Sequence, residues 1–191
     1  LVESPIKETH KAVLNLAKKN HAIISFDPNI RLPLWSSAEA CQETVREFLP
    51  DADLVKLSDE ECFFVTGKHS ILDAADWLFE QGCKMVLYSM GKEGAMILTP
   101  HFSSHVENPE VRVKDTTGAG DAIIGAYLYC LAKNHITVSQ LADCLPEQVQ
   151  EWLTFAVYYA NYSITKSGAI ASYPDYTTFV KWMQEKRKKA H

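Results

Sequence analysis

A glycine-rich stretch, Asp115-Thr-Thr-Gly-Ala-Gly-Asp121, joins two segments with different hydrophobic patterns. Residues 111–114 alternate apolar and charged side chains, as a strand does, whereas residues 122–131 are almost wholly apolar, as in a buried helix. The stretch is therefore predicted to form a strand-to-helix turn. Free N–H groups and the positive dipole end at a helix start favour a phosphate, and Gly118 and Gly120 would let it approach the backbone closely.

Asp121 is expected in the first turn of that helix, beside the bound phosphate. A carboxylate repels a phosphate that is only a ligand, but it is useful if it accepts the proton of a hydroxyl that attacks phosphorus. The alternative is that Thr116 or Thr117 caps the helix and Asp121 interacts favourably with its dipole. A dinucleotide fingerprint is excluded because Ile123 stands at its third glycine, and the chain has no Gly-Lys-Ser/Thr of a Walker A loop.

Predicted helices and strands alternate along most of the chain, which favours a parallel sheet covered by helices on both faces and hence an α/β fold. A Gly-Lys-Glu-Gly turn at 91–94 is expected to join two strands as a hairpin. Helices are predicted at 5–20, 36–49, 59–65, 70–81, 122–131, 146–166 and 177–189, and strands at 22–26, 54–57, 85–90, 95–98 and 111–114.

Composition indicates a compact intracellular protein. The 191 residues, 47% of them hydrophobic, can form one domain or a large part of one, and the net charge of −5 argues against a nucleic-acid binder. The basic run 186–189 is explained by favourable cations at a helix C-terminus. Five cysteines form no Cys-x-x-Cys pair, as expected in a reducing compartment. No signal peptide opens the chain, and no apolar run reaches the roughly 20 residues of a membrane span, so we expect a cytoplasmic location without membrane partners.

Ligands of such sheets bind beyond the carboxyl ends of the strands, and three predicted strand ends carry polar residues. Asn29 and Arg31 follow the first, where Arg31 could neutralise phosphate charge or simply pair with a nearby carboxylate. Ser58 and Glu61 follow the second and match a helix capping box. Ser89 precedes the turn at 91–94, whose two glycines suit any tight hairpin.

The motif at 115–121 and the apolar helix after it resemble the second signature of the ribokinase-like sugar kinases, the PfkB carbohydrate kinases. Further segments match in the family's order over essentially the whole chain, and Asp27-Pro-Asn-Ile-Arg31 with Leu34-Trp35 resembles the fructokinase branch. The resemblance implies a ribokinase-like three-layer α/β/α fold with a mostly parallel central sheet. It also implies ATP- and Mg²⁺-dependent phosphorylation of a sugar hydroxyl.

The resemblance assigns roles to particular residues. Asp121 takes the position of the catalytic base, and the N–H groups around Gly118, Ala119 and Gly120 receive the phosphoryl charge. Glu61 is associated with Mg²⁺ through water, although the family often has asparagine where this chain has Ser58. A monovalent cation such as K⁺ is held in some relatives at the positions of Asp115 and Thr117, near Ser172. Candidate contacts to the nucleotide and its phosphates are Asn29, Arg31, Ser89, Gly91, Gly94, Asn161 and Gly168.

Relatives of this type are usually about half again as long, so we expect residues 1–191 to be the C-terminal nucleotide-binding and catalytic portion of a single, incomplete domain. The segment 1–5 resembles a connecting segment. We expect this portion alone to be a poor kinase, because the lid and most sugar contacts would lie elsewhere, and an exposed sheet edge would favour a homodimer. Two alternatives stay open: a kinase for a keto-deoxy sugar acid or a riboside, and a non-catalytic nucleotide-binding module.

Overall fold

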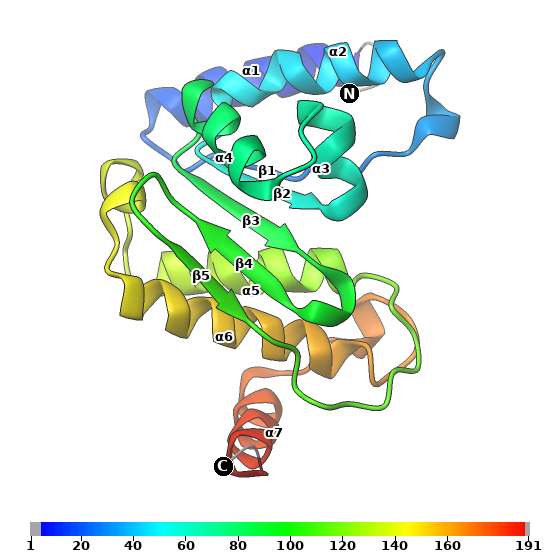
Figure 1. Ribbon diagram of the computed structural model, residues 1–191, viewed down its shortest axis with the longest axis vertical. Coiled ribbons are helices and arrows are strands. Elements are labelled where there is room, and N and C mark those ends of the chain that lie inside the picture. Colours follow the sequence, from blue (N-terminus) through cyan, green and yellow to red (C-terminus); the bar gives the residue numbers. More distant parts are fainter. Residues whose placement is uncertain (1–4, 190–191) are drawn as a thin grey trace. The chain divides into compact units, whose positions relative to one another are not determined.

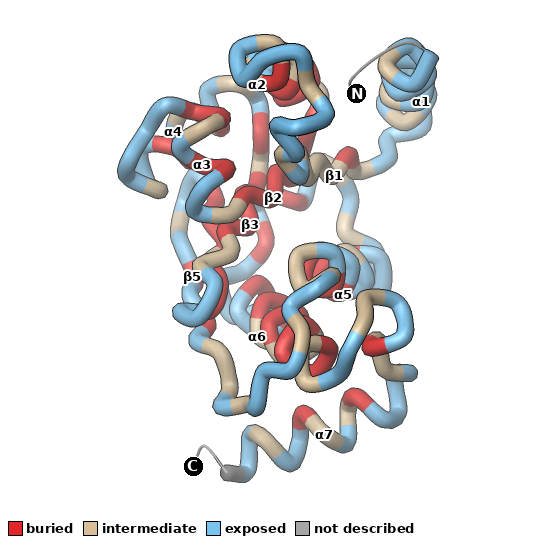
Figure 2. The backbone as a smooth tube through the Cα atoms, turned by 90° about the vertical axis from the view of Figure 1, so that its right-hand side faces the viewer, coloured by how far each residue is buried: buried red, intermediate tan, exposed pale blue. Residues whose placement is uncertain are grey.

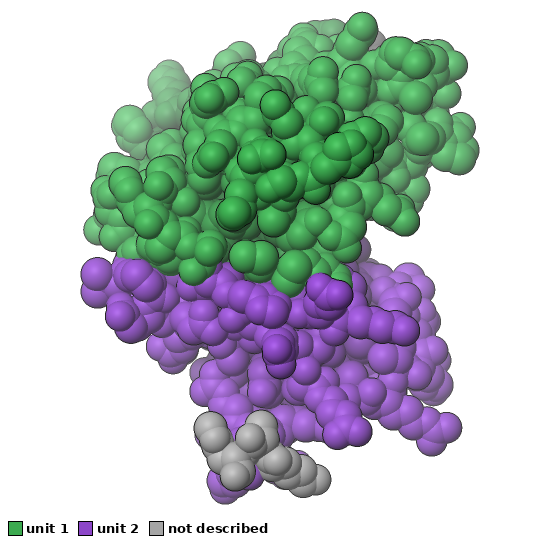
Figure 3. All heavy atoms as spheres, viewed as in Figure 1, with its two compact units in different colours: residues 1–90, 96–103, 136–144 green, residues 91–95, 104–135, 145–191 purple. Residues whose placement is uncertain are grey.

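The computed structural model describes residues 5–189, so the connecting segment expected at 1–5 lies almost wholly outside the described residues (Figure 1). The described residues group into two compact units (Figure 3). The first unit lies within 1–90, 96–103 and 136–144, and the second within 91–95, 104–135 and 145–191.

The first unit packs helices against parallel strands. Val45, Val65 and Leu78 come from three different helices and share one core cluster with Val55 and Val86 of the two central strands. Those strands, β2 and β3, each begin with an unbroken run of buried residues, which is typical of strands covered on both faces. The elements are α1 (Ile6–Lys19), β1 (Ser25–Phe26), α2 (Ala38–Phe48), β2 (Leu54–Ser58), α3 (Asp59–Thr66), α4 (Ile71–Glu80) and β3 (Met85–Ser89).

Within residues 5–189 the sheet has five strands in the order β1-β2-β3-β4-β5, with β4 at Ala95–Leu98 and β5 at Ser103–Val106. β2 runs parallel to both β1 and β3, with Leu54 opposite Ser25 and Met85. The connections from β3 to β4 and from β4 to β5 are too short for a parallel crossover, so these neighbours run antiparallel and the sheet is mixed.

The second unit is built around α5 (Ala119–Lys133), α6 (Pro146–Ser163) and α7 (Tyr176–Lys189). Tyr127 of α5 and Trp152 of α6 meet edge to face, with ring centroids 6.5 Å apart. Phe179 of α7 is fully buried and packs edge to face on Phe155 and Tyr159 of α6. Figure 2 shows the buried positions along α5 and α6. These aromatic contacts fix the helix whose first turn carries Asp121.

Most predicted elements are confirmed, several to within two residues at each end. The predicted strand at 111–114 is wrong: residues 107–116 have no regular secondary structure. The N–H groups of Lys114 and Asp115 both donate to the carbonyl of Ile164, at 2.8 and 3.2 Å, rather than to a neighbouring strand. The first strand is shorter than predicted, and β5 was not predicted, because its Ser-Ser-His-Val sequence has no apolar run. None of the described helices has the length and hydropathy of a membrane span.

Candidate active site

The first turn of α5 presents backbone donors without a side-chain cap. Its N-cap is Gly118, in the left-handed conformation with φ +79°, and no side chain of the described chain caps this helix. The alternative in which the side chain of Thr116 or Thr117 caps the helix is therefore wrong. Of these two residues, only Thr116 bonds to the start of the helix, where its backbone carbonyl accepts the N–H of Ala119 at 3.1 Å. The next N–H groups, on Gly120 and Asp121, precede the first intrahelical bond of α5 and remain as donors for an anion.

Gly118 is enclosed by the loop that precedes α7. The Tyr173 hydroxyl donates to the Gly118 carbonyl at 2.9 Å. A Cβ added at Gly118 would stand 2.7 Å from the Tyr173 hydroxyl and 2.8 Å from the Cβ of Ala169. Glycine is thus required here both by the backbone conformation and by the space available.

Asp115 ties the turn to the loop that follows α6. One carboxylate oxygen accepts the N–H of Thr117 at 2.9 Å, and the other accepts the N–H of Gly168 at 2.8 Å. These hydrogen bonds, Gly168 first, lower the pKa of Asp115 from 3.8 to about 2. Asp115 therefore has a structural role, in which its carboxylate joins the backbone of the turn to that of the later loop. The monovalent-cation role of Asp115 and Thr117 stays a prediction.

The lowered pKa of Asp115 gives a pH-dependent contribution to stability. A carboxyl group whose pKa falls on folding contributes fully above its unfolded pKa, and the contribution disappears as the pH falls through the folded value. We expect thermal stability to decline as the pH is lowered from about 4 to about 2, and the Asp115→Asn variant to lack that part of the decline. Thermal unfolding of both proteins across this range measures it; identical pH slopes would show that Asp115 contributes nothing.

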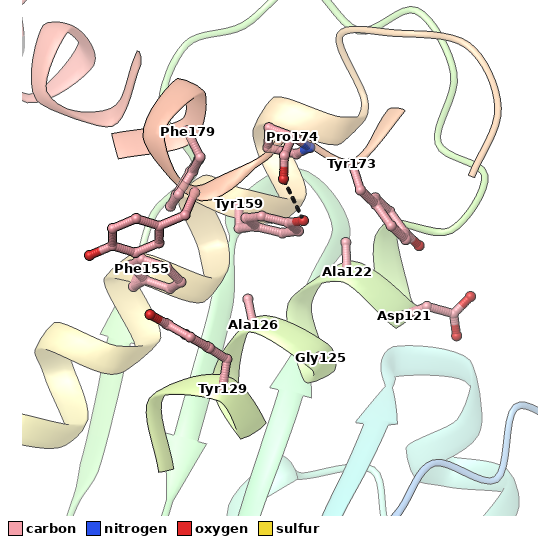
Figure 4. A pocket seen from close by; sticks show the side chains of 11 residues that line it. Asp121, Ala122, Gly125, Ala126, Tyr129, Phe155, Tyr159, Tyr173, Pro174 and Phe179 are labelled. Carbon is pink, nitrogen blue, oxygen red and sulfur yellow. Dashed lines mark hydrogen bonds between the residues drawn. The ribbon is translucent and has the colours of Figure 1, made fainter. Parts of the chain in front are cut away.

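Asp121 is exposed and lies at the rim of a cavity of about 300 Å³. Figure 4 shows its carboxylate at one end of the cavity and the ring of Tyr173 close by. Burial, and then the negative charge of Asp121, raises the pKa of Tyr173. The cavity walls are mainly aromatic and small side chains, among them Ala126, Phe155 and Tyr159. The Tyr159 hydroxyl donates to the carbonyl of Pro174 at 3.2 Å.

A second polar group, in the first unit, is centred on Glu61. Its carboxylate accepts the N–H and the hydroxyl of Ser58, both at 2.9 Å, and the N–H of Ile30 at 3.2 Å. The capping box predicted for Ser58 and Glu61 is confirmed. Burial alone would raise the pKa of Glu61, but the positive charge of Lys56 and these hydrogen bonds outweigh it and lower the pKa.

Lys56 is a buried cation that no sequence motif indicated. Its ammonium group lies 3.2 Å from Asp27 and 3.7 Å from Glu61, so it joins the turn after β1 to the start of α3. Burial raises the pKa of Asp27, and Lys56 opposes that shift. The only signal in the sequence was a lysine inside an apolar strand, which is normally buried only when paired.

The remaining predicted site residues of the first unit are Asn29, Arg31 and Ser89, and their side chains form few or weak hydrogen bonds. Asn29 is exposed and has a positive φ of 42°. Arg31 is exposed and donates to the carbonyl of Ile30, and within the described residues it forms no ion pair with a carboxylate. Its guanidinium group is therefore available to an anionic ligand. The Ser89 hydroxyl makes a long hydrogen bond, 3.4 Å, to the carbonyl of Leu57.

In the second unit, the turn at 91–94 and Asn161 belong to one hydrogen-bonded group. Gly91 and Gly94 both have positive φ, and a Cβ at Gly94 would stand 2.0 Å from the Val106 carbonyl. Asn161 is buried and bonds to Asn108, a residue that the sequence did not single out. The predicted nucleotide contacts of these residues, and of Gly168, stay predictions.

The chain is similar to known proteins of one family. The model of the pfkB family carbohydrate kinases matches residues 1–176. Fructokinase-2 of Solanum habrochaites is 34% identical over 175 residues, which are 91% of this chain and 52% of that protein. The chain therefore spans about half the length of the curated relatives it matches.

Two solved structures are similar over nearly the whole chain. A Xylella fastidiosa fructokinase with bound ATP has a TM-score of 0.89 at 26% identity, covering 97% of this chain and 59% of its own. A Vibrio cholerae O395 fructokinase double mutant with bound fructose, ADP and potassium ion has a TM-score of 0.84 at 29% identity, covering 96% and 57%. The expected ribokinase-like α/β fold is thereby confirmed. The chain belongs to the pfkB family of carbohydrate kinases.

Proposed function

We propose that the protein of which this chain forms part is an ATP-dependent sugar kinase that phosphorylates a hydroxyl of fructose. The observation that carries the proposal is the uncapped first turn of α5, where two backbone donors and the Asp121 carboxylate occupy one helical turn. A bound phosphoryl group would meet the N–H groups of Gly120 and Asp121, and Asp121 would accept the proton of the attacking hydroxyl. The fructokinases among the relatives favour fructose as the acceptor.

The residues present fit a Mg²⁺-nucleotide. Mg²⁺ usually keeps several waters and takes one or two carboxylates, and its complex with ATP supplies the transferable phosphoryl group and neutralises its charge. Glu61 already accepts three hydrogen bonds and faces Lys56, so it would act on the ion through water. Arg31 would neutralise further phosphate charge. Asp115 and Thr117 would hold K⁺, which accompanies ADP in the similar Vibrio cholerae structure.

We also propose a cytoplasmic location, since all five cysteines are free and buried. Homodimer formation through a sheet edge stays a prediction, and β1 and β5 are the edge strands.

The proposal is tested by ADP release from Mg²⁺-ATP against a panel of acceptors, on this chain and on a complete version. The panel is headed by fructose and includes a keto-deoxy sugar acid and a riboside. Fructose-dependent release by the complete version is expected, with little from this chain. Release with another acceptor would reassign the substrate, and saturable ATP binding without release by either protein would favour the non-catalytic module.

A further inference from the structure

The carbonyl groups of the turn at 91–93 are all held by side chains of a later segment. Asn108 donates from Nδ2 to the carbonyls of Gly91 at 2.8 Å and Lys92 at 3.1 Å. The ring nitrogen Nε2 of His105 lies 2.9 Å from the carbonyl of Glu93, where it can act only as a donor. The three successive peptide groups of this turn are thereby fixed in orientation.

Asn108 is itself held by a buried residue of α6. Asn161, which is 4% exposed, donates to Oδ1 of Asn108 at 2.7 Å and to the carbonyl of Val157 at 2.8 Å. The Asn108 amide can satisfy its neighbours in one orientation only, because a flip would set its oxygen against two carbonyls and its NH₂ group against that of Asn161. The network therefore runs from α6 through Asn108 to the turn.

We infer that Asn108 is a positioning residue for the nucleotide, and that Asn161 acts through it. This inference rests on the proposed function and, within it, on the nucleotide contact predicted from the sequence for the turn at 91–94. A trans peptide places C=O and N–H on opposite sides, so holding the Gly91 carbonyl toward Asn108 directs the Lys92 N–H the other way. At one end of the turn, the backbone of Gly94 packs closely against that of Val106. At the other end, Asn108 sets the orientation of the Gly91 and Lys92 peptide groups.

The decisive variant is Asn108→Asp in the complete protein. A carboxylate keeps an acceptor for Asn161 but loses both donors and repels the two carbonyls. Two lost hydrogen bonds at a binding contact correspond to about a tenfold or greater rise in the KM for ATP, with kcat and the KM for the sugar within about threefold. Asn134→Asp is the matched control. Asn134 likewise donates its side-chain amide to a backbone carbonyl, that of Cys130 at 2.8 Å, but it lies at the C-terminal end of α5.

Hydrogen exchange gives a second readout that does not depend on turnover. Without nucleotide, the peptide covering 91–94 should exchange about tenfold faster in Asn108→Asp than in the parent, and at the parental rate in Asn134→Asp. Faster exchange with an unchanged KM for ATP would overturn the inference, as would an equal rise in KM in the Asn134 variant. Asn108→Ser replaces the first variant if that one does not fold.

Failure of the proposed function is distinguishable from failure of this inference. If the parent binds Mg²⁺-ATP but phosphorylates no acceptor, the kinase proposal fails, and the Kd for ATP replaces the KM in the same comparison of variants. If the parent binds no nucleotide, the inference on Asn108 is overturned, whatever the exchange rates show.

Discussion

Asp121→Asn should lower kcat by about 10²- to 10⁴-fold in the complete protein, the range expected when a positioned general base is removed. Asparagine has nearly the same size and cannot accept the hydroxyl proton. Because Asp121 is exposed and lies in the first turn of α5, its neutralisation should leave the fold intact and affect ATP binding little. The measurement is initial-rate ADP release at saturating ATP and sugar, with ATP binding measured separately.

The control for charge removal alone is Asp143→Asn. Asp143 belongs to the other unit, and its side chain is 74% exposed. This variant should keep the parental kcat. Near-parental turnover in Asp121→Asn would show that Asp121 is not the base, whereas an equal loss in both variants would point to an effect of net charge.

Gly118→Ala should lower kcat by about 10²- to 10³-fold, comparable to the loss of one preorganised donor of an oxyanion site. The added Cβ would lie 2.7 Å from the Tyr173 hydroxyl and 2.8 Å from the Cβ of Ala169, so the loop before α7 and the start of α5 must move apart. The N–H groups of the first turn of α5 move with that helix start. A positive φ of 79° adds backbone strain of about 1 kcal/mol.

Gly67→Ala separates backbone strain from crowding. Gly67 also has a positive φ, 73°, at the end of α3, but nothing lies within 4 Å of an added Cβ. It should lower thermal stability by a similar strain contribution and leave kcat unchanged. If both variants lost turnover equally, strain and general loosening, rather than the geometry of the anion site, would be responsible.

The fold was largely predictable because its helices and strands have strong local signals. The capping box predicted at Ser58 and Glu61 marks the start of α3 and is present in the structure, where the helix ends at Gly67 in the left-handed conformation. The segment 111–114 was misjudged because alternation over four residues does not ensure a partner strand. The N–H of Lys114 bonds to the end of α6, a contact set by tertiary structure.

The site was predictable at the glycine-rich motif and much less so elsewhere. Gly118 was predictable because the backbone conformation and the space at that turn require glycine, whereas the role of Asp121 as the base stays a prediction. Tyr173, Lys56 and Asn108 were not singled out, because each has a partner far along the chain. The separations are 55 residues for Tyr173 and Gly118, 53 for Asn108 and Asn161, and 29 for Lys56 and Asp27. No local pattern encodes such pairings.

Asp115 and Gly118 are both hydrogen-bonded to the loop after α6, and these two bonds imply an order of folding during synthesis. The motif at 115–121 leaves the ribosome before its partners Gly168 and Tyr173, which lie 53 and 55 residues further along the chain. Until α6 and the loop after it have emerged, the start of α5 lacks both of these hydrogen bonds. The nascent protein would then leave the proposed phosphate-binding turn incompletely formed until late in translation, and any ligand of this turn would stabilise it only afterwards.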